Sequence, residues 1–138
     1  MTVTGGCLCG GVRFECSTGP DSASYCHCAD CRRTTGSAFN TGVRFPGASF
    51  RLVKGAAKGF RKAADSGTWL TRYFCPDCGS PLYTVSDAWP DMVFIMAGAL
   101  DDPSVVEPAY QLWTRSRVPW ATIPAELPSY EKGRVKPT

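Results

Sequence analysis

The sequence lacks several features that would assign it to a common class of protein. No apolar run approaches the roughly 20 residues that a membrane-spanning helix needs, so no membrane association is expected. There is no long basic run, and a net charge of +3 is a poor electrostatic footprint for binding nucleic acid. No internal repeat, low-complexity segment or long linker divides the 138 residues. These absences predict one soluble globular domain, residues 1–138, whose polar end at about 131–138 forms a flexible tail.

The N-terminal residues also lack a charged leader and an apolar run before Cys7. No secretory signal peptide is therefore visible, and a cytoplasmic location with reduced thiols is expected. The eight cysteines could instead form a disulfide framework, since an even count in a short chain is typical of small secreted domains. Pairs separated by only one or two residues suit convergence on a metal ion better than long-range cross-links. The spacing therefore favours metal binding.

Seven of the cysteines fall into three tight groups, which are Cys7-x-Cys9, Cys26-x-Cys28-x-x-Cys31 and Cys75-x-x-Cys78. A closed tetrahedral zinc site uses four thiolates, and three would then remain. Three protein ligands with an exchangeable fourth position are typical of a catalytic zinc. The cysteine count therefore predicts two zinc ions per chain, one structural and one catalytic.

The spacing of the groups also indicates which cysteines share an ion. Cys75 and Cys78 flank a tight turn that Gly79 closes, as in a zinc knuckle, but they supply only half of a structural site. The middle group already has three ligands, so pairing the first group with the knuckle leaves no group split between ions. The predicted structural ligands are Cys7, Cys9, Cys75 and Cys78, and the predicted catalytic ligands are Cys26, Cys28 and Cys31.

The remaining pattern is that of a β-rich domain. Fourteen glycines and eleven prolines separate short extended segments. Val12, Phe14 and Cys16 alternate with polar residues, which predicts a half-buried strand with Cys16 as a buried free thiol. Short helical turns are expected only at 29–34 and 103–106. Further strands are expected at 24–26, 38–45, 50–53, 59–63, 69–74, 82–85 and 92–97.

Several segments together resemble the glutathione-dependent formaldehyde-activating enzyme family, whose domain is called CENP-V/GFA. The matching segments follow the family order through nearly the whole chain, at 5–14, 26–39, 74–82, 98–103 and 119–120. The resemblance implies an Mss4-like fold that is mainly β, with small antiparallel sheets, zinc-clipped loops and little helix. It also implies the same division of the cysteines between a structural and a catalytic zinc.

The activity that the resemblance implies is a carbon–sulfur lyase reaction, which forms or breaks S-(hydroxymethyl)glutathione from formaldehyde and glutathione. The expected partners are a small thiol and an aldehyde, and the oligomeric state stays open. Zinc with three thiolates leaves room for a soft fourth ligand, and a thiol that binds there loses its proton near neutral pH. Arg32 and Arg33 follow the last ligand, where they could offset negative charge or bind substrate carboxylates. Either arginine could equally be a solvated surface charge.

For several other residues, a structural role is the alternative to a functional one. His27 lies between two ligands in an extended segment, so its side chain should face away from both thiols and pack or hydrogen-bond rather than ligate. Gln111 stands where many relatives carry a histidine, and glutamine does not shuttle protons near pH 7. Asp101 and Asp102 are read as a turn or helix start before Pro103 rather than as a general base. Core or pocket-wall positions are expected for Trp69, Trp89, Trp113 and Trp120.

Two non-enzymatic functions remain as alternatives. Mss4-like folds also serve as non-catalytic zinc-binding protein-interaction modules. An inert module needs no open metal position, so the three-cysteine group argues against that alternative. A zinc-ribbon nucleic-acid binder is disfavoured by the weak basic charge.

Overall fold

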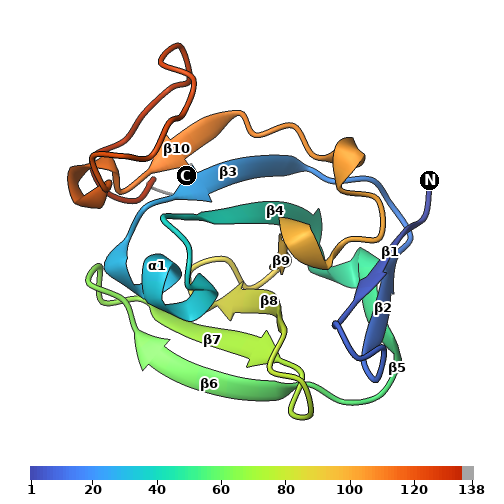
Figure 1. The fold of residues 1–138 in the computed structure, drawn as a ribbon. Coiled ribbons are helices and arrows are strands. Elements are labelled where there is room, and N and C mark those ends of the chain that lie inside the picture. Colours follow the sequence, from blue (N-terminus) through green and yellow to red (C-terminus); the bar gives the residue numbers. More distant parts are fainter. Residues whose placement is uncertain (135–138) are drawn as a thin grey trace.

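Residues 1–134 are the part of the chain described by this computed structural model, and they contain two β-sheets and one α-helix (Figure 1). The smaller sheet has the order β1 (Val3–Gly6), β2 (Arg13–Cys16), β5 (Phe50–Lys54). The larger sheet has the order β10 (Tyr110–Leu112), β3 (Ser22–Cys26), β4 (Asn40–Pro46), β9 (Met92–Met96), β8 (Pro81–Ser86), β7 (Trp69–Phe74), β6 (Lys58–Ala63). Short 3-10 helices are η1 (Gly47–Ser49), η2 (Ala97–Ala99), η3 (Pro103–Val105) and η4 (Thr114–Ser116).

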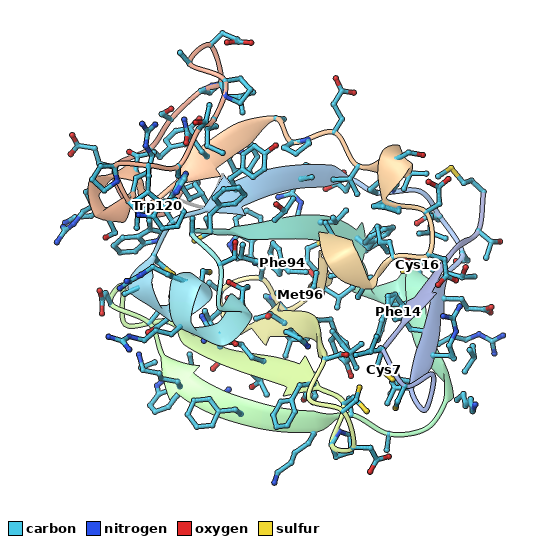
Figure 2. The ribbon with its side chains drawn as sticks, viewed as in Figure 1. Cys7, Phe14, Cys16, Phe94, Met96 and Trp120 are labelled. Atoms are coloured by element: carbon cyan, nitrogen blue, oxygen red, sulfur yellow. The ribbon has the colours of Figure 1, made fainter. Side chains whose placement is uncertain are left out.

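The core lies between the two sheets. Alternate residues of β4 and β9 are buried on the face that meets the smaller sheet, namely Val43, Phe45, Val93 and Ile95. The smaller sheet contributes Phe14 and Cys16 (Figure 2), both fully buried as the alternation predicts. Desolvation raises the pKa of the Cys16 thiol to about 11, so this cysteine is an inert apolar side chain.

The opposite face of the larger sheet curves around α1 (Ala29–Thr35), so that strands from both ends of the sheet approach the helix (Figure 1). The helix begins after Cys28, whose side chain accepts from the Cys31 N–H, and ends at Gly36, which adopts the left-handed conformation. An ion pair of 2.8 Å between Asp30 and Lys62 joins its first turn to β6. Phe94 and Met96 of β9 lie inside this curve (Figure 2).

The expected mainly β fold with little helix is confirmed, and each strand expected from the sequence is present within a few residues. Two strands were missed, β1 and β10. The expectation of small antiparallel sheets needs a correction, because β10 pairs with β3 in parallel and the larger sheet has seven strands. No helix among residues 1–134 combines the length and the apolar character needed to cross a membrane.

The C-terminal segment packs back along β10. Backbone N–H groups of Trp113 and Arg115 donate to the carbonyls of Lys132 and Glu131. The flexible tail expected at 131–138 stays a prediction, and residues 135–138 lie outside the described part of the chain. The expectation of a core position is wrong at Trp69 and Trp120, which are 47% and 73% exposed.

Candidate metal centres

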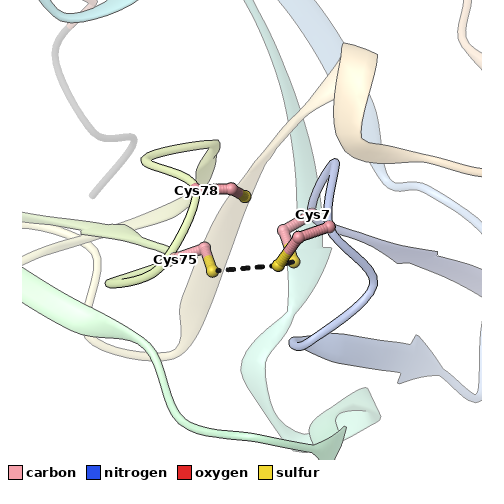
Figure 3. A group of neighbouring side chains, drawn as sticks. Cys7, Cys75 and Cys78 are labelled. Atoms are coloured by element: carbon pink, nitrogen blue, oxygen red, sulfur yellow. Dashed lines mark hydrogen bonds between the residues drawn. The ribbon is translucent and has the colours of Figure 1, made fainter.

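Four cysteine sulfurs meet where the two sheets come together. Cys7 and Cys9 lie in the turn after β1, and Cys75 and Cys78 lie in the knuckle after β7 (Figure 3). All four Sγ atoms lie within 4.8 Å of one another. The Cys9 and Cys75 sulfurs, in loops that follow strands of different sheets, are 3.8 Å apart. The partition expected from the spacing therefore matches the grouping in the fold.

The backbone around this four-cysteine site favours thiolates. The Val12 N–H donates to Cys7 Sγ at 3.2 Å, and this bond holds the pKa of Cys7 below its ordinary value. The Gly11 N–H donates to Cys9 Sγ at 3.4 Å. The side chain and backbone of Ser80 lower the pKa of Cys78 to about 5. Because metals bind the deprotonated thiol, these contacts suit a closed metal site.

The second group is assembled by one short segment. Cys26 ends β3, Cys28 caps α1, and Cys31 lies in the first turn of the helix. Their three sulfurs also lie within 4.8 Å of one another. The Cys31 N–H donates to Cys28 Sγ at 3.2 Å. Hydrogen bonds from the Cys26 and Cys31 thiols hold the pKa of Cys28 well below its ordinary value, and the positive charge of Arg72 adds to this lowering.

His27 belongs to neither cysteine group. Its ring is fully buried, and its Nε2 lies 2.9 Å from the side-chain oxygen of Gln111. The Ser129 hydroxyl donates to the Leu127 carbonyl and accepts from the Gln111 amide nitrogen at 2.9 Å. The Gln111 oxygen is therefore the acceptor for His27, and Nε2 carries the hydrogen. This arrangement agrees with the expected hydrogen-bonding role of His27.

The position of Gln111 follows from the missed strand β10. Gln111 is buried and pairs with Tyr25 of β3, directly beside the segment that carries the three-cysteine group. The backbone N–H of His27 donates to the Leu112 carbonyl, which extends this pairing past Cys26. Glutamine at this position serves as a hydrogen-bonding partner that holds the histidine ring.

The two aspartates behave as the turn interpretation predicts. Asp101 accepts hydrogen bonds from the guanidinium of Arg13 and from the Thr4 hydroxyl, and the Arg13 bond is the main reason that its pKa falls to about 2. Asp102 accepts from the Ser104 N–H at 3.0 Å and so caps η3. Neither carboxylate is placed as a general base.

Arg32 and Arg33 are exposed on α1. Their contact with substrate stays a prediction. The cation that acts on the three-cysteine group is Arg72 of β7, whose charge reaches Cys28 and Cys31. The sequence analysis missed it, although an arginine at the middle of a strand between Leu70 and Phe74 is an available signal.

Two cavities lie beside the cysteine groups. The larger one, about 910 Å³, is a groove whose lining includes Cys7, Arg13, Tyr25, Asn40 and Asp101. The smaller one, about 210 Å³, is lined by Thr34, Arg72, Tyr73 and Thr84 among others. Pro81 and Met96 line both cavities, which are therefore adjacent to each other. Asn40 pairs with Cys26 across β3 and β4, so one end of the groove lies next to the three-cysteine group.

Comparisons with known proteins support the family resemblance and the fold. The sequence model of the family described as glutathione-dependent formaldehyde-activating enzyme matches residues 2–116. A Halomonas elongata protein named "Putative glutathione-dependent formaldehyde-activating enzyme" is 32% identical over 106 residues, which are 73% of this chain and 67% of the relative. A crystal structure of a Rhodobacter sphaeroides protein superposes with a TM-score of 0.58 at 20% identity. That alignment covers 91% of this chain and 98% of the other, and it supports the fold.

Proposed function

Because the chain belongs to the glutathione-dependent formaldehyde-activating enzyme family, we propose that it is a zinc-dependent carbon–sulfur lyase. The proposed reaction forms or breaks a thiol–aldehyde adduct such as S-(hydroxymethyl)glutathione. The observation that carries this proposal is the three-cysteine group, which offers three of four tetrahedral ligands beside a large groove. A purely structural site would have no need for an incomplete ligand set.

The residues present fit two zinc ions. Both groups offer only thiols, which are soft ligands that zinc accepts, and both contain backbone N–H groups that donate to sulfur. We assign Cys7, Cys9, Cys75 and Cys78 to a structural zinc, and Cys26, Cys28 and Cys31 to a catalytic zinc. When bound, the catalytic ion would supply Lewis acidity that lowers the pKa of a thiol at its open position.

The groove has the size of a site for a small organic molecule. Its volume of about 910 Å³ lies near the upper end of the range for ligand pockets, about 300–1,000 Å³. An extended thiol such as a tripeptide fits a space of this size. We assign the body of the thiol to the groove, with the sulfur at its Cys26 end, and keep Arg32 and Arg33 as candidate contacts for substrate carboxylates.

The proposed reaction needs little acid–base chemistry from the protein. Addition of a thiol to formaldehyde forms one C–S bond, converts the carbonyl to an alcohol, and moves the thiol proton to the new hydroxyl oxygen. His27 is the one histidine of the chain, and its Nε2 hydrogen is donated to Gln111. Proton exchange with water therefore fits this site better than a histidine relay.

The test combines metal analysis with a kinetic measurement. Protein purified under reducing conditions should contain about two zinc ions per chain, since each group forms one site. NMR exchange spectroscopy should then show faster interconversion of formaldehyde, glutathione and their adduct than in buffer alone. A single zinc per chain would contradict the two-site assignment.

A wider screen tests the reaction class. If glutathione and formaldehyde gain no acceleration, other thiols and aldehydes should be tested with the zinc-loaded protein. Failure of every pair would reject the lyase proposal and favour the non-catalytic module. A cytoplasmic location, where thiols stay reduced, remains part of the proposal.

A further inference from the structure

Arg72 differs from the other arginines that lie in the described strands. Each of the others forms an ion pair with a carboxylate, and these pairs are Arg13–Asp101, Arg44–Asp21, Arg51–Glu15 and Arg61–Asp87. Arg72 is half-buried and has no carboxylate or side-chain hydrogen-bond partner among residues 1–134. Partial burial of an unpaired charge is costly, so a compensating negative charge is expected nearby.

The sheet register places Arg72 inside the curve that encloses α1. Arg72 pairs with Thr84 of β8, and Thr84 pairs with Phe94 of β9, so the three side chains share one face. Phe94 lies inside the curve beside Met96 (Figure 2). The ligand-bearing end of α1 approaches the same face, because the Asp30–Lys62 ion pair joins the helix to the adjacent strand β6.

Arg72 lines the 210 Å³ cavity, which is large enough for a small ligand. Its lining joins Arg72 to Thr34 of α1, three residues after Cys31, and to Thr84. Since one water molecule occupies about 30 Å³ of liquid, the space suits a molecule of a few heavy atoms. Arg72 also lies close enough to Cys28 and Cys31 for its positive charge to favour the thiolate form of both.

We propose that Arg72 is a catalytic residue that stabilises the oxyanion formed when a substrate thiolate adds to a small aldehyde held in the 210 Å³ cavity. This inference rests on the proposed function. The sulfur lone pair forms the C–S bond, and the carbonyl π electrons move to the oxygen, which becomes an alkoxide. The guanidinium donates hydrogen bonds to the alkoxide oxygen until that oxygen takes up the proton that the thiol has lost. No oxidant or reductant is needed.

The position of Arg72 favours an alkoxide over a remote carboxylate as its partner. In the adduct the oxygen is separated from the sulfur by a single carbon, so it lies next to the site where the sulfur binds. The carboxylates of a tripeptide thiol lie several bonds farther from the sulfur. A cation that acts on the ligand sulfurs themselves is therefore closer to the reacting oxygen.

The kinetic experiment compares Arg72→Met and Arg72→Lys with a matched control, Arg61→Met. Arg61 lies on the adjacent strand β6, and it pairs with Thr71, so its side chain points to the opposite face. Loss of one preorganised oxyanion donor typically lowers kcat by about 10² to 10³. We expect a fall of that size for Arg72→Met, a smaller fall for Arg72→Lys, which keeps the charge, and none for Arg61→Met. Zinc content should be unchanged in all three.

Two thiols distinguish whether Arg72 contacts the alkoxide of the adduct or a carboxylate of the thiol substrate. Glutathione carries carboxylates and 2-mercaptoethanol carries none, and an oxyanion role predicts the same loss of kcat with both. A loss confined to KM for glutathione would overturn the proposal and make Arg72 a carboxylate contact. Equal kcat in wild type and Arg72→Met would also overturn it.

A binding measurement separates this inference from the proposed lyase activity. Formate has an anionic oxygen and is small enough to enter the cavity, and its binding to the zinc-loaded protein can be followed by the backbone amide NMR signals of β7 and β8. We expect saturable shifts in wild type and Arg61→Met, with at least tenfold weaker binding in Arg72→Met. Identical titrations in all three proteins would contradict an anion site at Arg72, even if the lyase assay succeeds. If the assay fails and formate binding depends on Arg72, the proposed lyase fails while the anion site stands.

Discussion

The two cysteine groups differ in how far apart in the chain their members lie. The four-cysteine site joins the turn after β1 to the knuckle after β7, and so connects the smaller sheet to the larger one. The three-cysteine group spans only residues 26–31 and is held by one strand–helix junction. A metal in the first site closes a long loop, whereas a metal in the second site orders a segment that is already local.

This contrast predicts that the first site stabilises the fold and that the second site serves the reaction. Loss of the four-cysteine site would release the contact between sheets on which the shared core depends. Loss of the three-cysteine site would remove the candidate reaction centre and leave the sheets in place. The variants below test this contrast, from the largest expected effect to the smallest.

The largest effect is expected for Cys78→Ser. Binding of a structural zinc contributes about 10–16 kcal/mol in small zinc domains, which is comparable to the whole stability of a domain, about 5–15 kcal/mol. We therefore expect the variant to be largely unfolded at 25 °C, with loss of both zinc ions. Far-UV circular dichroism, a thermal melt and zinc analysis measure this. Cys16→Ala, at the buried cysteine outside both groups, is the control and should stay folded.

Cys28→Ser should produce the opposite pattern. We expect the loss of one zinc and of all acceleration of adduct exchange, because the removed thiol belongs to the proposed reaction centre. The melting temperature should stay within a few degrees of wild type, since the hydrogen bonds of the Cys28 side chain among residues 1–134 stay within its own segment. Similar melting curves for Cys28→Ser and Cys78→Ser would contradict the contrast between the sites.

A moderate effect is expected for Gln111→Ala, which tests how the three-cysteine segment is held by β10. The change leaves the buried Nε2–H of His27 without an acceptor, and such a group costs about 1–3 kcal/mol. Urea denaturation should show that loss of unfolding free energy. Ser129→Ala removes the outer end of the same hydrogen-bond chain, at an exposed residue, and should cost less. An equal cost for both variants would argue against the histidine contact as the cause.

The smallest effect is expected for Asp101→Asn, which weakens the ion pair between Arg13 of β2 and the segment between η2 and η3. The two side chains are 45% and 34% exposed, so the pair should contribute under about 1 kcal/mol, and added salt should reduce that contribution. The pKa of Asp101 is about 2, below its ordinary 3.8. Its stabilisation is therefore present above pH 4 and is lost only as the pH falls from about 4 to about 2. Urea denaturation should show a constant difference from wild type between about pH 6 and 9, and a difference that grows with pH in this range would contradict this origin.

Much of the fold and of the grouping of the cysteines could be predicted because the signals are local. Alternation of apolar and polar residues marks a strand such as β2 without reference to the rest of the chain. Cysteines separated by one or two residues must have neighbouring sulfurs wherever the segment lies. The partition between two sites followed from counting ligands, and the fold brings the same groups together.

The missed features depend on contacts between distant segments. β10 is only three residues long, and its strand character comes from pairing with β3, more than eighty residues earlier. The sequence analysis chose Arg32 and Arg33 instead of Arg72, because they directly follow Cys31. Both are exposed on α1. Adjacency in sequence is a weak guide here, because successive helical residues point in different directions.

The sequence by itself determined two sets of closely spaced thiols, the members of each set, and a β-rich chain to carry them. Those properties depend on residue types and short spacings. The tertiary structure alone decided what surrounds the thiols: the groove, the small cavity, the hydrogen bond from His27 to Gln111 and the charge of Arg72. These depend on the pairing of β10 with β3 and on the curvature of the seven-stranded sheet around α1, which no local pattern encodes.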